Sequence, residues 1–387
     1  MTRSLDLRPV RTASDLARFI DVPWRLDRAS GGDPCWVPPL RLAVKAALDL
    51  RHPFWRENRR QLWIAYEGDE PVGRIAAILN REHLAHWRDD TGFWGFFETA
   101  DRPDVASALL SAAEEWLAGQ GCRFAVGPVS PSPHYEMGIL TAGFDAPPHL
   151  MLTHNPPYYP AVIAAAGYEK AVDLYAYLIP LNGVRLEGKI ARVGATLEQR
   201  WGVTVRAGDL RQFDREAAII HELYNRSMLG QWGFTPIGAQ EFAAFAADLK
   251  RILDPDLCLF AEQGGVPVGF VLALPNLNEA LIHLRDGRLL PFGLLKLLWY
   301  RRRIRSVRVI LAGTLPEWQR RGVGSLLYRE ITHRVVAKGY AIAEMSWVLE
   351  ENVLMNRAAR LLGGSVHKTY RVYRKPLQPC FRPPLSP

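Results

Sequence analysis

Residues 311–328 read LAGTLPEWQRRGVGSLLY, and this stretch decides the fold. Its apolar start predicts the end of a strand, and its Leu- and Tyr-bearing end opens an amphipathic helix. Between them, Gly322 and Gly324 allow a tight turn that lets consecutive N–H groups approach a ligand, and the helix start adds a positive dipole end. Arg320 and Arg321 add charge beside the turn. This arrangement is typical of a loop that holds a pyrophosphate.

An internal repeat extends the argument to the whole chain. Residues 62–80 read LWIAYEGDEPVGRIAAILN and residues 257–276 read LCLFAEQGGVPVGFVLALPN, with seven identities at a fixed offset of 196. Each copy predicts a β-hairpin, because an apolar strand is followed by a Gly-containing turn and then by a Pro-Val-Gly entry into a second strand.

The similarity continues downstream with a slippage of one residue. Asn155 and Gly167 match Asn352 and Gly364, and each pair brackets an Ala- and Leu-rich helical segment. A Tyr-bearing strand follows in both copies. The sequence therefore predicts two copies of one α+β unit.

We expect these units to comprise residues 1–185 and 186–387, with a partly helical linker at 181–202. In the second unit, helices and strands alternate, which favours a mixed sheet with helices on both faces. The predicted elements are strands at 203–207, 307–312 and 341–347, helices at 213–227, 239–252, 322–338 and 353–362, and a terminal strand pair.

The turn at Gln319 to Gly324 resembles the signature of the GNAT superfamily, the Gcn5-related N-acyltransferases. That signature is [QR]-x-x-G-x-[GA] between a strand and a helix, and Pro316 stands three residues before the Gln here. The resemblance covers the second half and, more loosely through the hairpin, the first. It implies a splayed sheet that grips the pantetheine arm of an acyl-CoA co-substrate.

The resemblance also implies which residues bind this co-substrate. Main-chain amides from Arg320 to Ser325 would meet the pyrophosphate, and the strand end at 313–315 would pair with pantetheine amides. Many members carry a Tyr acid later in the last helix, where this chain has Leu361 and Leu362. The expected contacts are Thr314, Leu315, Gln319, Arg320, Arg321, Gly322, Val323, Gly324, Ser325, Asn352 and Asn356.

The first copy departs from this pattern. At 98–117 it reads ETADRPDVASALLSAAEEWL, with no glycine in the turn and with Glu98, Asp101 and Asp104 in place to repel a pyrophosphate. We interpret it as a degenerate GNAT-like unit that shapes the acceptor site. The Pro- and Gly-rich segment 127–148 is either a functional loop or a long structural connection.

An insertion at 285–308, RDGRLLPFGLLKLLWYRRRIRSVR, carries seven of the chain's eight net positive charges. Its apolar part leads through Trp299 into Arg301, Arg302 and Arg303, which suits the interface of an anionic membrane. Two other interpretations stay open: the apolar part packs against the other domain with solvated arginines, or the arginines bind cofactor phosphates. Nucleic acid is not expected, because no stacking platform or groove-reading helix is evident.

Acyl transfer to an amine requires removal of the ammonium proton, and in this family the segment EMSWVLEEN at 344–352 follows the strand beside the thioester carbonyl. The candidate bases on it are Glu344, Glu350 and Glu351, of which Glu350 is the first choice. Tyr370 is a candidate acid. The sequence reveals no partner for His367, which stays unassigned.

Composition sets the broad class. With 387 residues, 48% hydrophobic and 23% charged, the chain is an ordinary globular protein, and its net charge of +8 favours an anionic partner. Four scattered cysteines without a C-x-x-C pair indicate reduced thiols, a cytoplasmic setting and no metal site. Neither a secretory signal nor a long apolar span is evident, so we expect a protein that is not exported and does not cross a bilayer.

These observations predict an acyl-CoA-dependent N-acyltransferase. The segments DPCWVPPL, NPPYYPAVIAAAGY and MSWVLEENVLMNRAARLLGG look like those of a bacterial family that includes ceramide synthases, which join a fatty acyl group to the amine of a sphingoid base. A lipid acceptor agrees with peripheral contact at the inner face of the inner membrane. The alternatives are a small-molecule or peptide N-acetyltransferase using acetyl-CoA, and an aminoacyl-tRNA-dependent peptide ligase or non-catalytic binding module.

Overall fold

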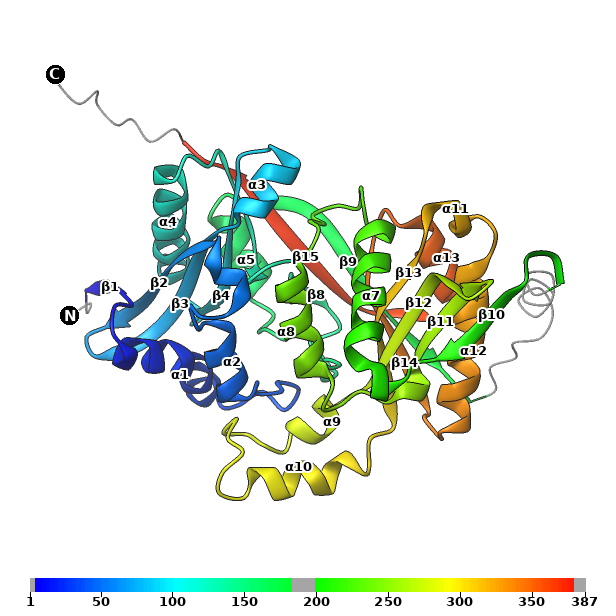
Figure 1. The fold of residues 1–387 in the computed structure, drawn as a ribbon. Helices are drawn as coiled ribbons and strands as arrows, with labels where there is room; N and C mark the ends of the chain where they lie inside the picture. Colours follow the sequence, from blue (N-terminus) through cyan, green and yellow to red (C-terminus); the bar gives the residue numbers. More distant parts are fainter. Residues whose placement is uncertain (1–3, 183–198, 379–387) are drawn as a thin grey trace. The chain divides into compact units, whose positions relative to one another are not determined.

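The computed structural model describes residues 4–182 and 199–378, which form two compact units (Figure 1). The N-terminal unit contains the chain up to Asp173, Leu281–Leu297 and the chain from Thr369. The C-terminal unit contains Leu174–Ala280 and Leu298–Lys368. Most of the linker predicted to be partly helical lies outside the described residues.

The N-terminal unit contains a mixed sheet in the order β1-β2-β3-β4-β5-β15. Its neighbours are antiparallel except β4 and β5, which are parallel. The strands are β1 (Leu5–Pro9), β2 (Arg59–Glu67), β3 (Glu70–Leu79), β4 (Thr91–Thr99), β5 (Phe124–Gly127), β6 (Val129–Ser130), β7 (Glu136–Met137), β8 (Ile139–Ala142) and the end of β15 (Ser365–Pro376). The helices are α1 (Ala13–Ala29), α2 (Arg41–Ala47), α3 (Arg81–Trp87), α4 (Pro103–Gly119) and α5 (Tyr159–Ala165).

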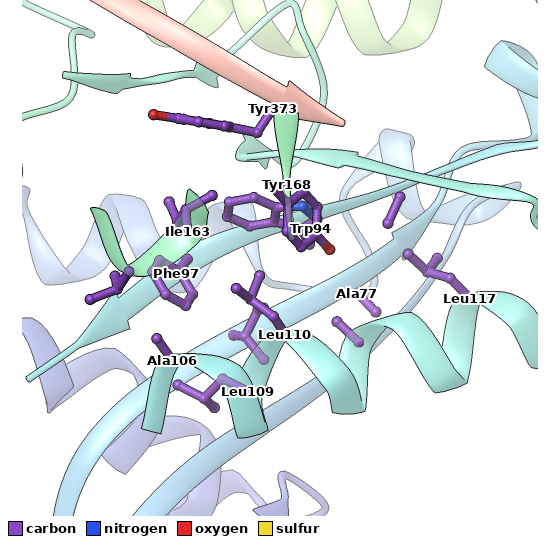
Figure 2. Close-up of a cluster of buried hydrophobic side chains, with 14 of the residues drawn as sticks. Ala77, Trp94, Phe97, Ala106, Leu109, Leu110, Leu117, Ile163, Tyr168 and Tyr373 are labelled. Carbon is purple, nitrogen blue, oxygen red and sulfur yellow. The ribbon is translucent and has the colours of Figure 1, made fainter. Parts of the chain in front are cut away.

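The core of this unit lies between α4, α5 and the sheet (Figure 2). Apolar residues recur on one side of α4, so that Leu109, Leu110 and Leu117 are fully buried against the strands. Trp94 of β4 meets Phe97 edge-on, with ring centroids 5.5 Å apart. Aromatic pairs in this geometry add stability beyond their buried area, so this core holds β4 firmly in place.

The C-terminal unit repeats the architecture in the order β9-β14-β13-β12-β11-β10, with β13 and β14 parallel. The strands are β9 (Glu169–Pro180), β10 (Val203–Ala207), β11 (Cys258–Gln263), β12 (Val266–Pro275), β13 (Ser306–Thr314) and β14 (Ile342–Leu349). The helices are α7 (Phe213–Ser227), α8 (Ala239–Leu249), α9 (Asn278–Leu281), α10 (Gly293–Arg301), α11 (Pro316–Gln319), α12 (Val323–Ala337) and α13 (Val353–Leu361). The predicted mixed sheet flanked by helices is confirmed.

Helices cover both faces of the C-terminal sheet. Val307, Val309 and Met345 point toward α12 and line a small cavity beneath it. Leu272 and Leu311 point toward α7 and α8 on the opposite face. Because successive side chains of a strand alternate between faces, Arg308 and Glu344 also belong to the face that α7 and α8 cover.

The unit boundaries differ from the predicted ranges 1–185 and 186–387 in three places, of which Leu281–Leu297, part of the N-terminal unit, is one. Leu174–Pro180, the end of β9, pairs with β14 of the C-terminal unit. Thr369–Pro376, the end of the chain's last strand, pairs with β8 and β5 of the N-terminal unit. The predicted terminal strand pair is wrong, because the last strand is the single β15.

The predicted slippage in the repeat is also wrong. Gly167 follows α5 at a φ of 87°, and the residue that follows α13 with the same geometry is Gly363, at 82°, rather than Gly364. The offset of 196 therefore returns at the end of the copies, where β9 and β15 correspond residue for residue.

Candidate functional site

The candidate site is built where β13 and β14 part. These parallel strands pair only from Ser306 with Ile342 to Val309 with Met345 in the described structure. Just beyond that point β13 bulges against β12, and β14 bulges against β9. A bulge bends its strand and disrupts the ladder, so the end of β13 carries main-chain groups that do not pair with β14. The resemblance implied a splayed sheet, and the C-terminal unit contains one.

The glycine turn follows β13. Gly322 precedes α12 with a φ of 94°, a left-handed conformation that favours glycine. Within the described chain no side chain caps this helix, so the N–H groups of its first turn lack an intrahelical partner. A Cβ added at Gly324 would meet only ordinary contacts, the nearest at 3.8 Å to Thr314 Oγ1. Packing within the chain therefore does not require Gly324, whereas close approach of a ligand would.

Hydrogen bonds fix the turn to the strand. Gln319 Nε2 donates to the Thr314 carbonyl oxygen at 3.2 Å. The amide of the buried Leu315 donates to the Val268 carbonyl oxygen at 3.0 Å, and the Arg321 amide donates to the Trp318 carbonyl oxygen at 3.1 Å. The amides of Leu315 and Arg321 are thus engaged within the chain. The amides that α12 itself offers to an anion begin beyond Arg321.

Two exposed arginines flank the turn. The Arg321 guanidinium carbon lies 4.3 Å from the ring centroid of Trp201 and 4.5 Å from that of Trp318. Such cation–π contacts hold the charge near the start of α12. Arg320 also exposes its side chain there, so the turn combines helix-end amides with positive charge.

Asn352 and Asn356 organise the turn between β14 and α13. The Asn352 side chain accepts a hydrogen bond from the Met355 amide at 3.1 Å and so caps α13. Asn356 is buried, and its Nδ2 donates to the carbonyl oxygen of Leu349 at 2.9 Å. Its Oδ1 accepts from the Tyr177 hydroxyl at 2.7 Å. These contacts support the strand end, and a direct role in binding the co-substrate stays a prediction.

A buried polar network lies at the splay. Glu344 on β14 is completely buried; its Oε2 lies 2.6 Å from His367 Nε2, and its Oε1 accepts from Ser346 Oγ at 2.7 Å. The buried Arg308 donates from Nε to Ser346 Oγ at 2.9 Å and is the register partner of Glu344 across β13 and β14. A hydrogen bond between one ring nitrogen and a carboxylate orients an imidazole and sets which of its nitrogens carries the proton.

The structure distinguishes among the predicted catalytic residues. Glu344 joins this network, whereas Glu350 lies half-buried where β14 turns toward α13. Tyr370 is fully buried in the N-terminal unit, where it pairs with Leu140 of β8. Sequence reasoning missed His367 and Arg308. A single histidine does not indicate a catalytic site in the sequence when its partner is distant along the chain. Arg308 was grouped with the basic insertion, although the structure buries it.

The equivalent splay of the N-terminal unit is occupied by its own chain. β4 and β5 pair only from Thr91 with Phe124 to Phe93 with Val126 within the described residues. The Phe96 amide, just past the parting point, donates to Ser130 Oγ at 2.8 Å. A Cβ on Gly95 would clash with the Val129 carbonyl oxygen, so this segment lies directly against β4.

Buried side chains complete this closure. Glu98 Oε2 accepts from the Tyr159 hydroxyl at 2.8 Å, and Glu98 Oε1 lies 3.5 Å from the guanidinium of the buried Arg74. Burial raises the pKa of Glu98 and lowers the pKa of Arg74, while each charge opposes the shift in the other. The Thr99 amide donates to Tyr159 Oη at 3.0 Å. The end of β4 therefore satisfies its polar groups internally.

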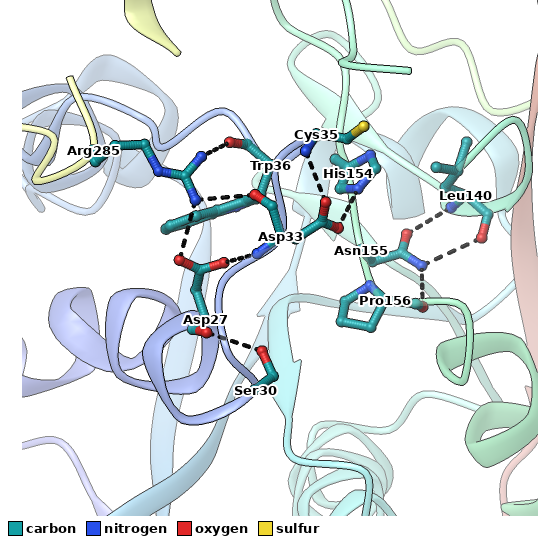
Figure 3. Close-up of polar contacts among 10 residues, drawn as sticks. All are labelled: Asp27, Ser30, Asp33, Cys35, Trp36, Leu140, His154, Asn155, Pro156 and Arg285. Atoms are coloured by element: carbon teal, nitrogen blue, oxygen red, sulfur yellow. Dashed lines mark hydrogen bonds and ion pairs between the residues drawn. The ribbon is translucent and has the colours of Figure 1, made fainter. Parts of the chain in front are cut away.

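The base of the insertion is anchored within the N-terminal unit (Figure 3). Arg285 donates to the carbonyl oxygens of Trp36 at 2.8 Å and Asp33 at 2.9 Å, and it lies 3.4 Å from Asp27 Oδ2. The Asp33 carboxylate in turn lies 2.8 Å from His154 Nε2. Arg285 and the buried Arg308 thus serve structural contacts, and the free charge of the insertion lies between them.

The middle of the insertion forms α10, which buries none of its residues. Phe292, Leu295 and Trp299 are 68%, 65% and 59% exposed. These apolar side chains are thus available for contact with a partner surface. Arg301, Arg302 and Arg303 follow and are exposed. Within the described part of the chain, no helix combines the length and apolar character needed to cross a bilayer.

Comparisons with known proteins agree with this geometry. The model of the acetyltransferase (GNAT) family matches residues 217–363, which include the splay and the glycine turn. A tandem GNAT protein from the clavulanic acid biosynthesis pathway has a TM-score of 0.59 at 14% identity, covering 97% of this chain and all of its own. At that identity the likeness shows the fold alone.

Two curated relatives match almost the whole chain. A bacterial ceramide synthase from Caulobacter vibrioides is 37% identical over 382 residues, which cover 96% of this chain and 98% of that protein. Protein YghO from Escherichia coli strain K12 is 34% identical and covers 95% of each chain. The fold and the site thus define an N-acyltransferase of the GNAT class. Within that class, the chain belongs to the family of the Caulobacter ceramide synthase and YghO.

Proposed function

We propose that the protein transfers a fatty acyl group from acyl-CoA to the amine of a sphingoid base. The observation that carries the proposal is the meeting of a splayed sheet, an uncapped glycine turn and a histidine paired with a buried carboxylate in one unit. The name of the Caulobacter relative supplies the acceptor class. The predicted role of residues 1–185 in shaping the acceptor site is part of the same proposal.

Donor binding would use the start of α12. Its first-turn N–H groups after Gly322, together with Arg320 and Arg321, suit the pyrophosphate of an acyl-CoA. The unpaired edge at the end of β13 suits the amides of the pantetheine arm. No covalent enzyme intermediate is needed, because the thioester is already activated.

Proton transfer would use His367. The acceptor reaches the site as an ammonium, and removal of its proton exposes the nitrogen lone pair that attacks the thioester carbonyl carbon. His367 accepts that proton, and Glu344 positions the imidazole. The new C–N bond replaces the C–S bond, and the leaving thiolate takes up a proton. In this proposal His367 replaces Glu350 as the base, because His367 has a defined partner in Glu344.

Contact with an anionic membrane would use α10. Its exposed Leu295 and Trp299, with Phe292 just before the helix, would enter the headgroup region, while Arg301 to Arg303 would face anionic lipid. A lipid acceptor and a fatty acyl donor both reside at such a surface. We therefore propose peripheral association with the inner face of the inner membrane.

The test is mass spectrometry of products from purified protein supplied with a panel of acyl-CoAs and amines. We expect N-acylated sphingoid bases from long-chain acyl-CoAs. Acetylated polyamines or peptides alone would replace the proposal with the acetyltransferase alternative. Absence of any acyl-CoA binding would favour the ligase or binding-module alternative.

A further inference from the structure

An apolar pocket lies within the C-terminal unit, between α7, α8 and the sheet. Its walls are aromatic and aliphatic, and they include Phe213, Phe242, Phe245, Leu249, Leu253 and Leu311. The pyrophosphate turn does not use this pocket.

One wall of the pocket, Leu311, lies on β13 two residues beyond the last pair of that strand with β14. The bulge at Ile310 interrupts the alternation of the strand, so Leu311 joins Arg308 on the face that α7 and α8 cover. Three residues of strand separate them by about 10 Å. The polar network around Glu344 and the apolar pocket thus lie on one face of one sheet.

The carboxylates that line the pocket already have hydrogen-bond partners within the chain. Glu216 accepts from Arg206 Nη1 at 2.9 Å, and the Arg206 Nε donates to Glu262 at 2.7 Å. Asp209 at the rim accepts from the Arg211 amide at 2.9 Å. A charged head group would find little here to recognise it, whereas a hydrocarbon chain would find matching walls.

We infer that this pocket receives the hydrocarbon chain of the acyl donor, an inference that rests on the proposed function. The thioester carbon would be fixed at the splay of β13, and the chain attached to it would pass Leu311 to enter the pocket on the same face. The amine would approach His367 instead. The pocket therefore makes the enzyme selective for long acyl groups.

The test narrows the pocket without touching the pyrophosphate turn. Ala246 on α8 lines the pocket, whereas its neighbour Ala247 is exposed and does not. In Ala246→Phe, the affinity for palmitoyl-CoA should fall at least tenfold, because each excluded methylene costs about fourfold. The affinity for butyryl-CoA should change by less than about twofold. Ala247→Phe is the matched control and should leave both affinities unchanged.

These affinities are measured by titration calorimetry without any amine, so they are independent of the acceptor. Equal losses for both donors, or no change in their ratio, would overturn the inference. Leu249→Ala, which enlarges the pocket, should move the optimum toward longer chains, and thermal unfolding checks that each variant is folded. A raised KM for the sphingoid base with an unchanged donor ratio would assign the pocket to the acceptor. Failure to form ceramide despite chain-length-dependent binding would sink the proposed function but not the pocket.

Discussion

The two copies of the repeat share one sheet topology, yet the N-terminal splay is filled by its own chain. At the end of β13 the residue facing α7 is Gly313, which approaches Ser227 closely. The corresponding position of β4, set by the pairing of Gly73 with Thr99 and of Gly269 with Thr314, is Glu98. One unit has a glycine without a side chain at this position, and the other has a half-buried carboxylate that bonds to its own chain.

The polar network follows the same division. Matching Thr91 and Phe124 to Ser306 and Ile342 places Phe93 and Val126 where the C-terminal unit has Arg308 and Glu344. The repeat offset places Ala171 where it has His367. The N-terminal copy thus keeps the sheet and replaces the charged groups with apolar ones. The comparison teaches that the fold is maintained by packing, whereas chemistry depends on a few side chains at the parting strands.

The strongest test of this difference replaces His367 of the C-terminal unit by alanine, the residue that its counterpart has at position 171. His367→Ala should lower kcat by roughly 10²- to 10⁴-fold, because positioned acid–base groups contribute that much. Acyl-CoA affinity should stay unchanged, as titration calorimetry would show. His333→Ala, an exposed histidine on α12, is the matched control. A His367→Ala enzyme with unaltered kcat would remove the proton-transfer assignment.

The donor turn is tested next. Gly322→Asp should weaken acyl-CoA binding at least about 100-fold, because the new charge repels the pyrophosphate and its charge-assisted hydrogen bonds are lost. Gly322→Asn has the same shape without the charge and should lose far less. The same charge at the head of α4, in Arg102→Asp, should not alter affinity. Equal losses of acyl-CoA affinity in the α4 and α12 variants would mean that the two copies do not differ in binding the acyl donor.

The basic insertion gives an intermediate effect. Replacing Arg301, Arg302 and Arg303 by Gln should weaken binding to phosphatidylglycerol vesicles by up to about 100-fold, because each such charge contributes about 1 kcal/mol. Vesicle flotation at low and high salt measures this loss. The control replaces three exposed arginines on other helices or turns, Arg211, Arg215 and Arg357. An unaffected triple variant would exclude the membrane contact.

The smallest effect concerns the closed splay. Ser130→Ala removes the acceptor of the Phe96 amide and should lower the free energy of unfolding by about 1 kcal/mol. Acyl-CoA affinity should not change, since this splay holds its own chain. Ser111→Ala on the exposed side of α4 is the control in denaturant titrations. A gain of a second acyl-CoA site in Ser130→Ala would show that the copies are less different than their contacts indicate.

Local sequence signals predicted much of the fold. The hairpins, α7 and the helix after the glycine turn were expected from hydrophobic periodicity and turn residues, which act over a few neighbouring positions. The sequence did not predict that the end of β9 pairs with β14 and the end of β15 pairs with β5. Strand pairing over long sequence distances leaves no local pattern. The repeat alone favoured two self-contained halves.

The candidate site divides in the same way. The residues of the glycine turn are contiguous in sequence, so the spacing of their residue types was enough to predict the turn. His367 and Glu344 lie on different strands. Only the folded sheet brings His367 Nε2 within 2.6 Å of Glu344 Oε2. Asn356, expected near the co-substrate, proved to bind the main chain of its own turn, since a buried amide takes whatever partners surround it.

The sequence by itself determined the class of fold and the loop for an anionic donor, because helix starts, turns and strand periodicity are encoded by adjacent residues. Only the tertiary structure decided which splay is filled by its own chain, which carboxylate meets the histidine and which apolar surface stays exposed. Those properties depend on burial and on side-chain neighbours that are distant along the chain, and both arise only when the strands pair.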